Sequence, residues 1–318
     1  MTDLSQSAST RSIANNCEFS IYNNNMKYQD ALNKYDINLN DEEIAQEVQQ
    51  IIADNFDANN TPEVLKFSLG CIDLTSLNPT DNEERITDFT RRVNDFEEQY
   101  PDLDNVASIC VYPNFAEVVS TNLDVTEVHT TVVAAGFPSS QTFDEIKVAE
   151  CSLAVAAGAD EVDIVINVGQ MLAGQYEEMC DTIEECKAAC RDAIFKVILE
   201  TGALKTASNI AKASVLAMYS GADFIKTSTG KIDVAATPEA ALVMCKMIRQ
   251  YYDLTGNKIG FKVAGGVRTP EDAVKYYSIV KAVLGDEWLT KELYRIGASS
   301  AANNLLSAIL GAPTKHFL

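Results

Sequence analysis

Only two histidines occur in the 318 residues, His129 and His316. A zinc site with three histidine ligands is therefore excluded within one chain, and a histidine-based catalytic triad has few candidates. His129 lies in an apolar, strand-like run, which favours a structural role, and His316 lies in the C-terminal tail. This shortage disfavours metal-dependent enzymes of those kinds, and we expect neither a metal nor a cofactor.

The sequence also lacks long apolar runs, paired cysteines and an excess of basic charge. No run approaches the roughly 18 apolar residues of a membrane span, and residues 1–20 lack the apolar core of a secretory signal. The eight cysteines are scattered without a C-x2-C pair, which indicates reduced thiols in a cytoplasmic protein. The net charge of −21 argues against nucleic-acid or membrane partners, so an anionic substrate would need a local basic pocket.

The composition divides the chain into four parts. Residues 1–40 are rich in Ser, Asn and Asp, and we expect them to be disordered or loosely attached. A helix and linker follow over residues 41–62, because acidic residues in the first turn precede an apolar stripe that begins at Ile44. Residues 63–311 form the main domain, and residues 312–318 form a tail.

An alternation of short apolar runs and helical patterns fills the main domain. The runs are Val64–Leu74, Val106–Tyr112, Val128–Ala134, Glu161–Val168, Phe195–Glu200, Phe224–Lys226, Ile259–Ala264 and Leu293–Ile296. Eight strand–helix units over roughly 250 residues predict an α/β fold of the (β/α)8 TIM-barrel type with an N-terminal helical extension. The alternative is an open doubly wound sheet, which is disfavoured because no G-x-G-x-x-G follows the first strand.

Ionisable residues stand on three of the predicted strands. In such a barrel the active residues lie at the carboxyl ends of the strands, and alternation along each strand points Lys226, Lys262 and Asp163 into the lumen. A second ammonium and partial burial both lower a lysine pKa, which favours a nucleophilic amine able to form a Schiff base. Asp163 would relay protons. The alternative interpretation is a structural ion pair in the barrel core.

The segments after the last two strands indicate a phosphate site. Gly265 and Gly266 form a glycine-rich turn, and Ser299 and Ser300 open the last helix with free backbone N–H groups. Lys231, in the loop after Lys226, could add positive charge.

Weaker candidates lie on other strands. Asp73 and Thr75 could bind substrate hydroxyls, although Asp73 could equally order the lysines. Lys196 either supports Asp163 from behind or is a surface lysine. Cys110 is interpreted as a packing residue, because no histidine is placed to activate it.

Together these strand-end segments resemble the deoxyribose-phosphate aldolase family. The matching segments are Ile72–Thr75, Glu161–Asp163, Asp223–Lys231, Gly260–Lys262, Ala264–Arg268 and Arg295–Ser299. The resemblance covers about residues 64–310. It implies a metal-independent Schiff-base aldolase, without a cofactor, that reversibly cleaves 2-deoxy-D-ribose 5-phosphate, a small phosphosugar.

The resemblance also implies the role of each matching residue. Lys226 would form the Schiff base, Lys262 would lower its pKa, and Asp163 would act as the proton-relay acid and base. The residues on phosphate-binding segments would be Gly230, Lys231, Gly265, Gly266, Ser299 and Ser300. A homodimer is implied as well. Val263 stands where the family often has proline, and the tail lacks the terminal tyrosine that some members have.

Two other functions are compatible with the same residues. One is an isomerase-type enzyme that uses Lys226 and Asp163 for acid–base chemistry on a phosphosugar. The other is a phosphosugar-binding protein without catalytic activity.

Overall fold

Eight parallel strands close into a barrel in the order in which they follow along the chain. The computed structural model describes residues 28–317. The strands are β1 (Ile72–Thr75), β2 (Ser108–Val111), β3 (His129–Val133), β4 (Glu161–Val165), β5 (Ile194–Ile198), β6 (Phe224–Lys226), β7 (Gly260–Ala264) and β8 (Tyr294–Ala298). Hydrogen-bonded pairing of β8 with β1 closes the sheet, so the predicted barrel is confirmed and the open sheet is wrong.

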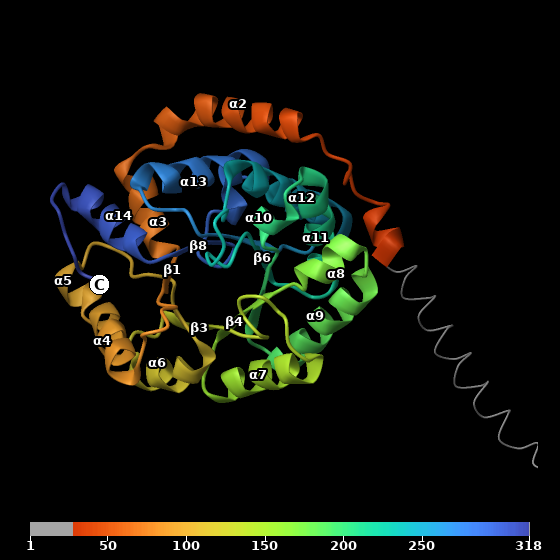
Figure 1. Cartoon of the computed structure of the whole chain (residues 1–318). Coiled ribbons are helices and arrows are strands. Elements are labelled where there is room, and N and C mark those ends of the chain that lie inside the picture. The colour runs from red at the N-terminus through yellow and green to blue at the C-terminus, as the bar shows by residue number, and fades with distance from the viewer. Residues whose placement is uncertain (1–27, 318) are drawn as a thin grey trace, which may run out of the picture.

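Helices surround the barrel on all sides (Figure 1). They are α2 (Asp41–Asn59), α3 (Pro62–Gly70), α4 (Glu83–Asn94), α5 (Phe96–Gln99), α6 (Ala116–Asn122), α7 (Asp144–Ala156), α8 (Val168–Ala173), α9 (Tyr176–Cys190), α10 (Thr201–Leu204), α11 (Ala207–Tyr219), α12 (Pro238–Thr255), α13 (Pro270–Leu284) and α14 (Ser300–Leu310). Outward-facing strand residues such as Ile225, Phe261 and Val263 are fully buried in the main apolar core, whose other side the helices supply. None of these described helices has the length and apolar character needed to cross a membrane.

The first predicted strand run, Val64–Leu74, is wrong over most of its length. Residues Pro62–Gly70 form helix α3, and β1 begins only at Ile72. The Thr61 side chain accepts a hydrogen bond from the backbone N–H of Val64, and Pro62 occupies the first turn. A threonine cap followed by proline is a typical helix start, and here it decides the conformation of an apolar stretch that also suits a strand.

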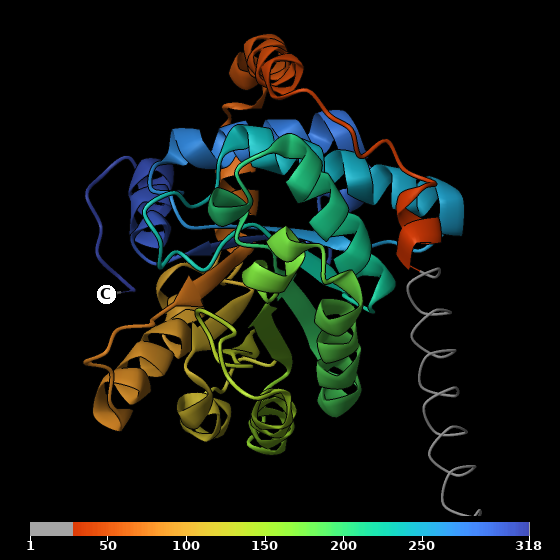
Figure 2. The same cartoon turned by 45° about the vertical axis from the view of Figure 1, so that its right-hand side comes forward.

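Helix α2 forms an additional layer outside the barrel helices, as predicted for an N-terminal extension. It packs on α12 and α13 and lies across their outer side (Figure 2). Asn40 caps its first turn with hydrogen bonds from the N–H groups of Glu42 and Glu43. The buried residues Ile44 and Val48 belong to the stripe that the sequence indicates.

The expectation of a loosely attached segment over residues 1–40 is wrong for its described part. Residues 1–27 lie outside the described residues, whereas residues 28–32 are helical. Tyr28 and Leu32 are buried in the main core, and the Tyr28 hydroxyl donates to a Glu184 carboxylate oxygen at 2.9 Å. Burial of these two apolar side chains stabilises the attachment of the segment, although its composition is otherwise polar.

The tail after α14 turns back onto α4 and α5. Phe317 is fully buried, and its ring stacks on that of Phe96 at 5.2 Å between centroids. His316 lies against the same ring, and its Nε2 is 2.6 Å from the carbonyl oxygen of Arg92. The described part of the tail therefore packs as a structural element.

Candidate active site

Two lysines stand side by side in the barrel lumen. The register of β6 and β7 pairs Lys226 with Lys262, and both side chains are buried. Asp163 on β4 faces both, because its Oδ2 lies 2.7 Å from the Nζ atom of each lysine. The structure thus brings together the three residues that the sequence predicts as catalytic.

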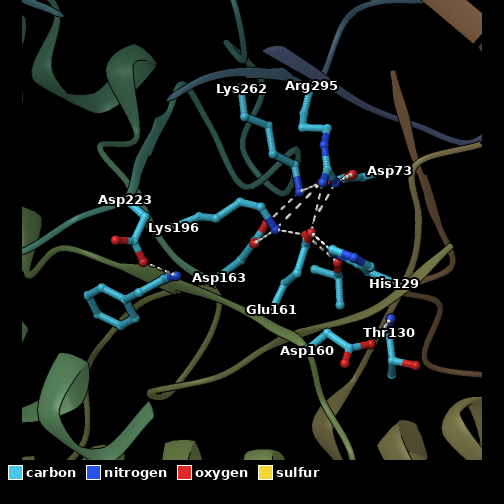
Figure 3. A network of polar contacts seen from close by, with 12 residues as sticks. Asp73, His129, Thr130, Asp160, Glu161, Asp163, Lys196, Asp223, Lys262 and Arg295 are labelled. Atoms are coloured by element: carbon cyan, nitrogen blue, oxygen red, sulfur yellow. Dashed lines mark hydrogen bonds and ion pairs between the residues drawn. The ribbon is translucent and has the colours of Figure 1, made fainter. Parts of the chain in front are cut away.

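Further charged residues extend this group across the lumen (Figure 3). Arg295 on β8 donates to Asp73 at 2.6 Å and to Glu161 at 2.8 Å. Lys196 on β5 donates to Asp163 at 3.0 Å and forms an ion pair with Glu161. Arg295 is 2% exposed, whereas Asp73, Glu161, Asp163 and Lys196 have no exposed surface, so the group is shielded from water.

The two neighbouring lysines have pKa values shifted in opposite directions. Burial lowers the pKa of Lys226, and the nearby Lys262 ammonium lowers it further, against the opposing effect of Asp163. Burial also acts to lower the pKa of Lys262, but the carboxylates of Asp163 and Asp73 outweigh it and raise that pKa. Lys226 is therefore the lysine that releases its proton more readily.

The carboxylate between them stays ionised. Burial acts to raise the pKa of Asp163, but Lys196, Lys226 and Lys262 together hold it well below its ordinary value. The Asp163 carboxylate is therefore an anion at neutral pH.

A cavity of about 350 Å³ opens from Lys226 toward the surface. It is lined by most of the residues predicted to bind substrate or phosphate, namely Thr75, Gly230, Lys231, Gly265, Gly266, Ser299 and Ser300. Arg268 lines it too, and its carbonyl oxygen accepts a hydrogen bond from Asn304. The reactive amine and the glycine- and serine-rich segments therefore share one space.

The glycine turns of this cavity need residues without a side chain. Gly265 has a φ of 76°, and a Cβ atom there would lie 2.6 Å from the Cβ of Ala235 and 3.1 Å from the Cα of Gly230. Such a contact is too short for carbon atoms, so the loops after β6 and β7 could not approach as they do. This close approach keeps the backbone of both loops at the cavity wall.

The first turn of α14 lies at the same wall, where Ser299 and Ser300 line the cavity. Its N-cap residue, Ser299, makes no side-chain capping hydrogen bond. The helix N-terminus carries partial positive charge, and its first N–H groups have no partner within the helix. This end of the cavity therefore suits an anion such as phosphate.

Two of the weaker candidates are buried beside the central lysines. Asp73 pairs with Lys262 and Arg295 and does not line the cavity, which favours its ordering of the lysines over its contact with substrate hydroxyls. Lys196 is buried against Asp163, which fits a supporting partner and contradicts a surface lysine. Cys110 is buried near the lysines, and burial raises its thiol pKa, in keeping with a packing residue.

Sequence reasoning missed Glu161 and Arg295 as members of the lumen group. The signal was present, because Glu161 shares a strand face with Asp163, and the register pairs Arg295 with Lys262. It also missed Glu200, whose carboxylate accepts hydrogen bonds from the N–H and hydroxyl of Thr229 and so holds the loop after β6. Glu200 has a φ of 56°, which nothing in its local sequence indicates.

His129, which the sequence predicts to be structural, contacts Glu161 of the charged group in the lumen. Its Nδ1 lies 2.7 Å from Glu161, and this hydrogen bond raises the pKa of the imidazole. The residue does not line the cavity beside Lys226.

Comparison with known proteins gives consistent results. The family model described as DeoC/LacD family aldolase matches residues 67–300. A Caenorhabditis elegans protein named as a candidate deoxyribose-phosphate aldolase is 41% identical over 270 residues, covering 84% of this chain and 88% of its own. The Homo sapiens deoxyribose-phosphate aldolase is 46% identical over 206 residues, covering 63% of each chain.

A solved structure has the same fold. A candidate deoxyribose-phosphate aldolase from Coccidioides immitis superposes with a TM-score of 0.64 at 28% identity. The match covers 86% of this chain and 99% of that chain.

Proposed function

This chain belongs to the DeoC/LacD aldolase family, and we propose that it is a deoxyribose-phosphate aldolase, a lyase of the class I type. It cleaves 2-deoxy-D-ribose 5-phosphate reversibly to D-glyceraldehyde 3-phosphate and acetaldehyde. The observation that carries the proposal is Lys226, a lysine of lowered pKa at the base of a cavity whose other wall offers free backbone N–H groups.

The first step joins Lys226 to the substrate. The neutral amine attacks the C1 aldehyde of the open-chain sugar, and the resulting carbinolamine loses water to give an iminium ion. Asp163 accepts hydrogen bonds from Lys226 and Lys262, so it relays protons between the substrate oxygens and these amines. Its low pKa means that it holds a proton only transiently.

The second step breaks the bond between C2 and C3. The C3 hydroxyl loses its proton, the C3 oxygen becomes the carbonyl of glyceraldehyde 3-phosphate, and the electron pair of the C2–C3 bond moves toward the iminium to give an enamine. Protonation of the enamine at C2 and hydrolysis of the new iminium release acetaldehyde and regenerate the Lys226 amine. The buried Asp163 carboxylate remains beside the cationic intermediates and stabilises them.

The phosphate is held at the opposite wall. Gly265, Gly266 and the N-terminus of α14 offer backbone donors, and Lys231 adds positive charge near them. These local donors and the positive charge of Lys231 favour binding of an anion, although the chain has a net charge of −21.

Covalent trapping tests the proposal. Reduction with borohydride in the presence of 2-deoxyribose 5-phosphate is expected to leave an adduct on Lys226, located by peptide mass spectrometry, and a coupled assay is expected to show turnover. A Lys226→Met variant is the control and should show neither. Substrate binding without an adduct in the unmodified protein would contradict the Schiff-base mechanism and favour acid–base chemistry, and binding without turnover would favour a phosphosugar-binding protein.

Assembly into a homodimer remains our expectation from the family resemblance. Light scattering coupled to size-exclusion chromatography measures the mass directly and would distinguish a dimer from a monomer or a larger assembly.

A further inference from the structure

The charged residues of the barrel lumen form a closed ring of alternating sign. Each of three cations bridges at least two of three carboxylates: Lys262 pairs with Asp73 and Asp163, Lys196 with Asp163 and Glu161, and Arg295 with Glu161 and Asp73. A longer contact of 3.7 Å joins Lys196 to Asp73 across the ring. Following these contacts leads from Asp73 through all six residues and back to Asp73. The ring joins strands β1, β4, β5, β7 and β8, and all six of its members are labelled in Figure 3.

Lys226 lies outside this ring. Among the described residues it has one ion-pair partner, Asp163, which is already shared by two ring cations. Three carboxylates and three permanent cations sum to zero, so the ring needs no further positive charge. A proton on Lys226, which is 4% exposed, therefore adds an uncompensated charge to a largely buried region.

We propose that this neutral ring decides which lysine becomes the nucleophile, and that Glu161 and Arg295 are positioning residues that set the protonation of Lys226 without touching the substrate. The inference rests on the proposed Schiff-base function. It assigns a role to two residues that lie below the cavity and do not line it.

The shifts of the three lysines agree with this arrangement. The two ring lysines, Lys196 and Lys262, have raised pKa values, because the attraction of their carboxylates outweighs burial. Lys226 alone among these lysines has a lowered pKa. Membership of the ring, more than depth of burial, separates the three, since all lie in the same buried lumen.

Other charged or titratable groups that face the ring are few. Cys110 faces Lys226 from β2 and is a neutral thiol of raised pKa. His129 faces Glu161 from β3, and the ring of Phe224 on β6 lies beside Lys196 and Arg295. His129 has an ordinary pKa near neutrality, and its hydrogen bond to Glu161 raises that pKa, so the test must control for it.

Opposite charge changes test the proposal. Glu161→Gln removes one negative charge and should lower the pKa of Lys226, whereas Arg295→Met removes one positive charge and should raise it. A unit charge on the order of 10 Å away shifts a pKa by about one unit at an effective dielectric constant of about 20. The probe is acetaldehyde with cyanoborohydride, and the rate of adduct formation on Lys226 is measured against pH for each variant by peptide mass spectrometry.

The expected result is a pair of profiles displaced in opposite directions, each by about one pH unit. The Glu161→Gln/Arg295→Met double variant should return toward the original profile. The series is repeated in a His129→Gln background. Lys147→Met is the matched control: it removes a buried cation on α7 outside the lumen and should leave the profile in place.

Unmoved profiles, or displacements in the same direction, would overturn the proposal. If Arg295→Met does not fold, Glu161→Gln alone decides, because its side chain keeps the original shape and only a shift to lower pH supports the ring. Failure of the proposed function would give a different result from failure of this inference. If the proposed function is wrong, the unmodified protein forms no adduct. If only this inference is wrong, the adduct forms but its pH profile does not depend on Glu161 and Arg295.

Discussion

The floor and the mouth of the barrel lumen bind charge in different ways. The floor is the ring of six ionised side chains, each held by at least two partners of opposite sign and shielded from water. The mouth is the cavity of about 350 Å³, whose wall uses glycine turns, serines and the first turn of α14. The floor therefore fixes a protonation state, and the mouth offers donors to a ligand that arrives from water.

This difference has an energetic reason. Buried charges are tolerated when every one is paired, and removal of one partner leaves its neighbours uncompensated. The donors at the mouth face water when the site is empty. Substitutions there should therefore lower the affinity for substrate more than the free energy of unfolding. Substitutions in the two regions should accordingly affect different measurements.

The largest effect is expected at Lys226. Lys226→Met removes the nucleophile, so turnover should fall on the order of 10⁴-fold or more. The free energy of unfolding should stay the same or rise, because Lys226 is the one lumen lysine of residues 28–317 that lies outside the neutral ring. Assay of turnover together with urea denaturation checks both parts, and a large loss of stability would contradict the distinction between Lys226 and the ring lysines.

The paired substitution Lys262→Met should behave in the opposite way toward stability. It leaves Asp73 and Asp163 each short of one partner, and breaking a buried pair costs about 3–5 kcal/mol. Removal of this neighbouring cation should also raise the pKa of Lys226, so activity near neutral pH falls and recovers partly as the pH rises. Full activity with an unchanged pH profile would show that Lys262 does not activate Lys226.

At the mouth, Gly265→Ala should impair binding with little effect on the ring. The added methyl group meets Ala235 and the Gly230 backbone, and a displacement of about 1 Å can cost on the order of 100-fold in catalytic efficiency. The expected change is a raised KM for the phosphorylated substrate. Gly230→Ala is the control, because φ is also positive there but its nearest contact is at 3.7 Å; an equal effect of both would point to φ alone.

The smallest effect is expected at Lys231, an exposed residue whose Nζ donates to the carbonyl oxygen of Leu77 at the cavity wall. Lys231→Met should raise the KM for 2-deoxyribose 5-phosphate about tenfold, the size of one hydrogen bond to a charged group. Catalysis with unphosphorylated 2-deoxyribose should not change. Equal losses with both substrates would place the role of Lys231 elsewhere than at the phosphate.

The sequence predicted the mouth and the central lysines well, because both depend on local pattern. Alternation along β6 and β7 points Lys226 and Lys262 inward, and glycine or serine after a strand marks the loops at the carboxyl end. The same local reasoning was wrong where two conformations compete, as in Val64–Gly70, which a threonine cap and a proline turn into α3. It left the role of Asp73 open, because the partners of Asp73 come from distant strands.

By itself, then, the sequence determined the order of the eight strands, the inward face of Lys226, Lys262 and Asp163, and the loops that surround the cavity. Tertiary structure alone decided which charge pairs with which across the lumen. Closure of the barrel brings Arg295 of β8 against Asp73 of β1 and Glu161 of β4. Alternation along a strand predicts that a side chain points inward, but it does not give the distance to side chains on other strands. Those distances depend on the stagger of the strands in the closed barrel, and they place six of these charges in a ring and leave Lys226 outside it.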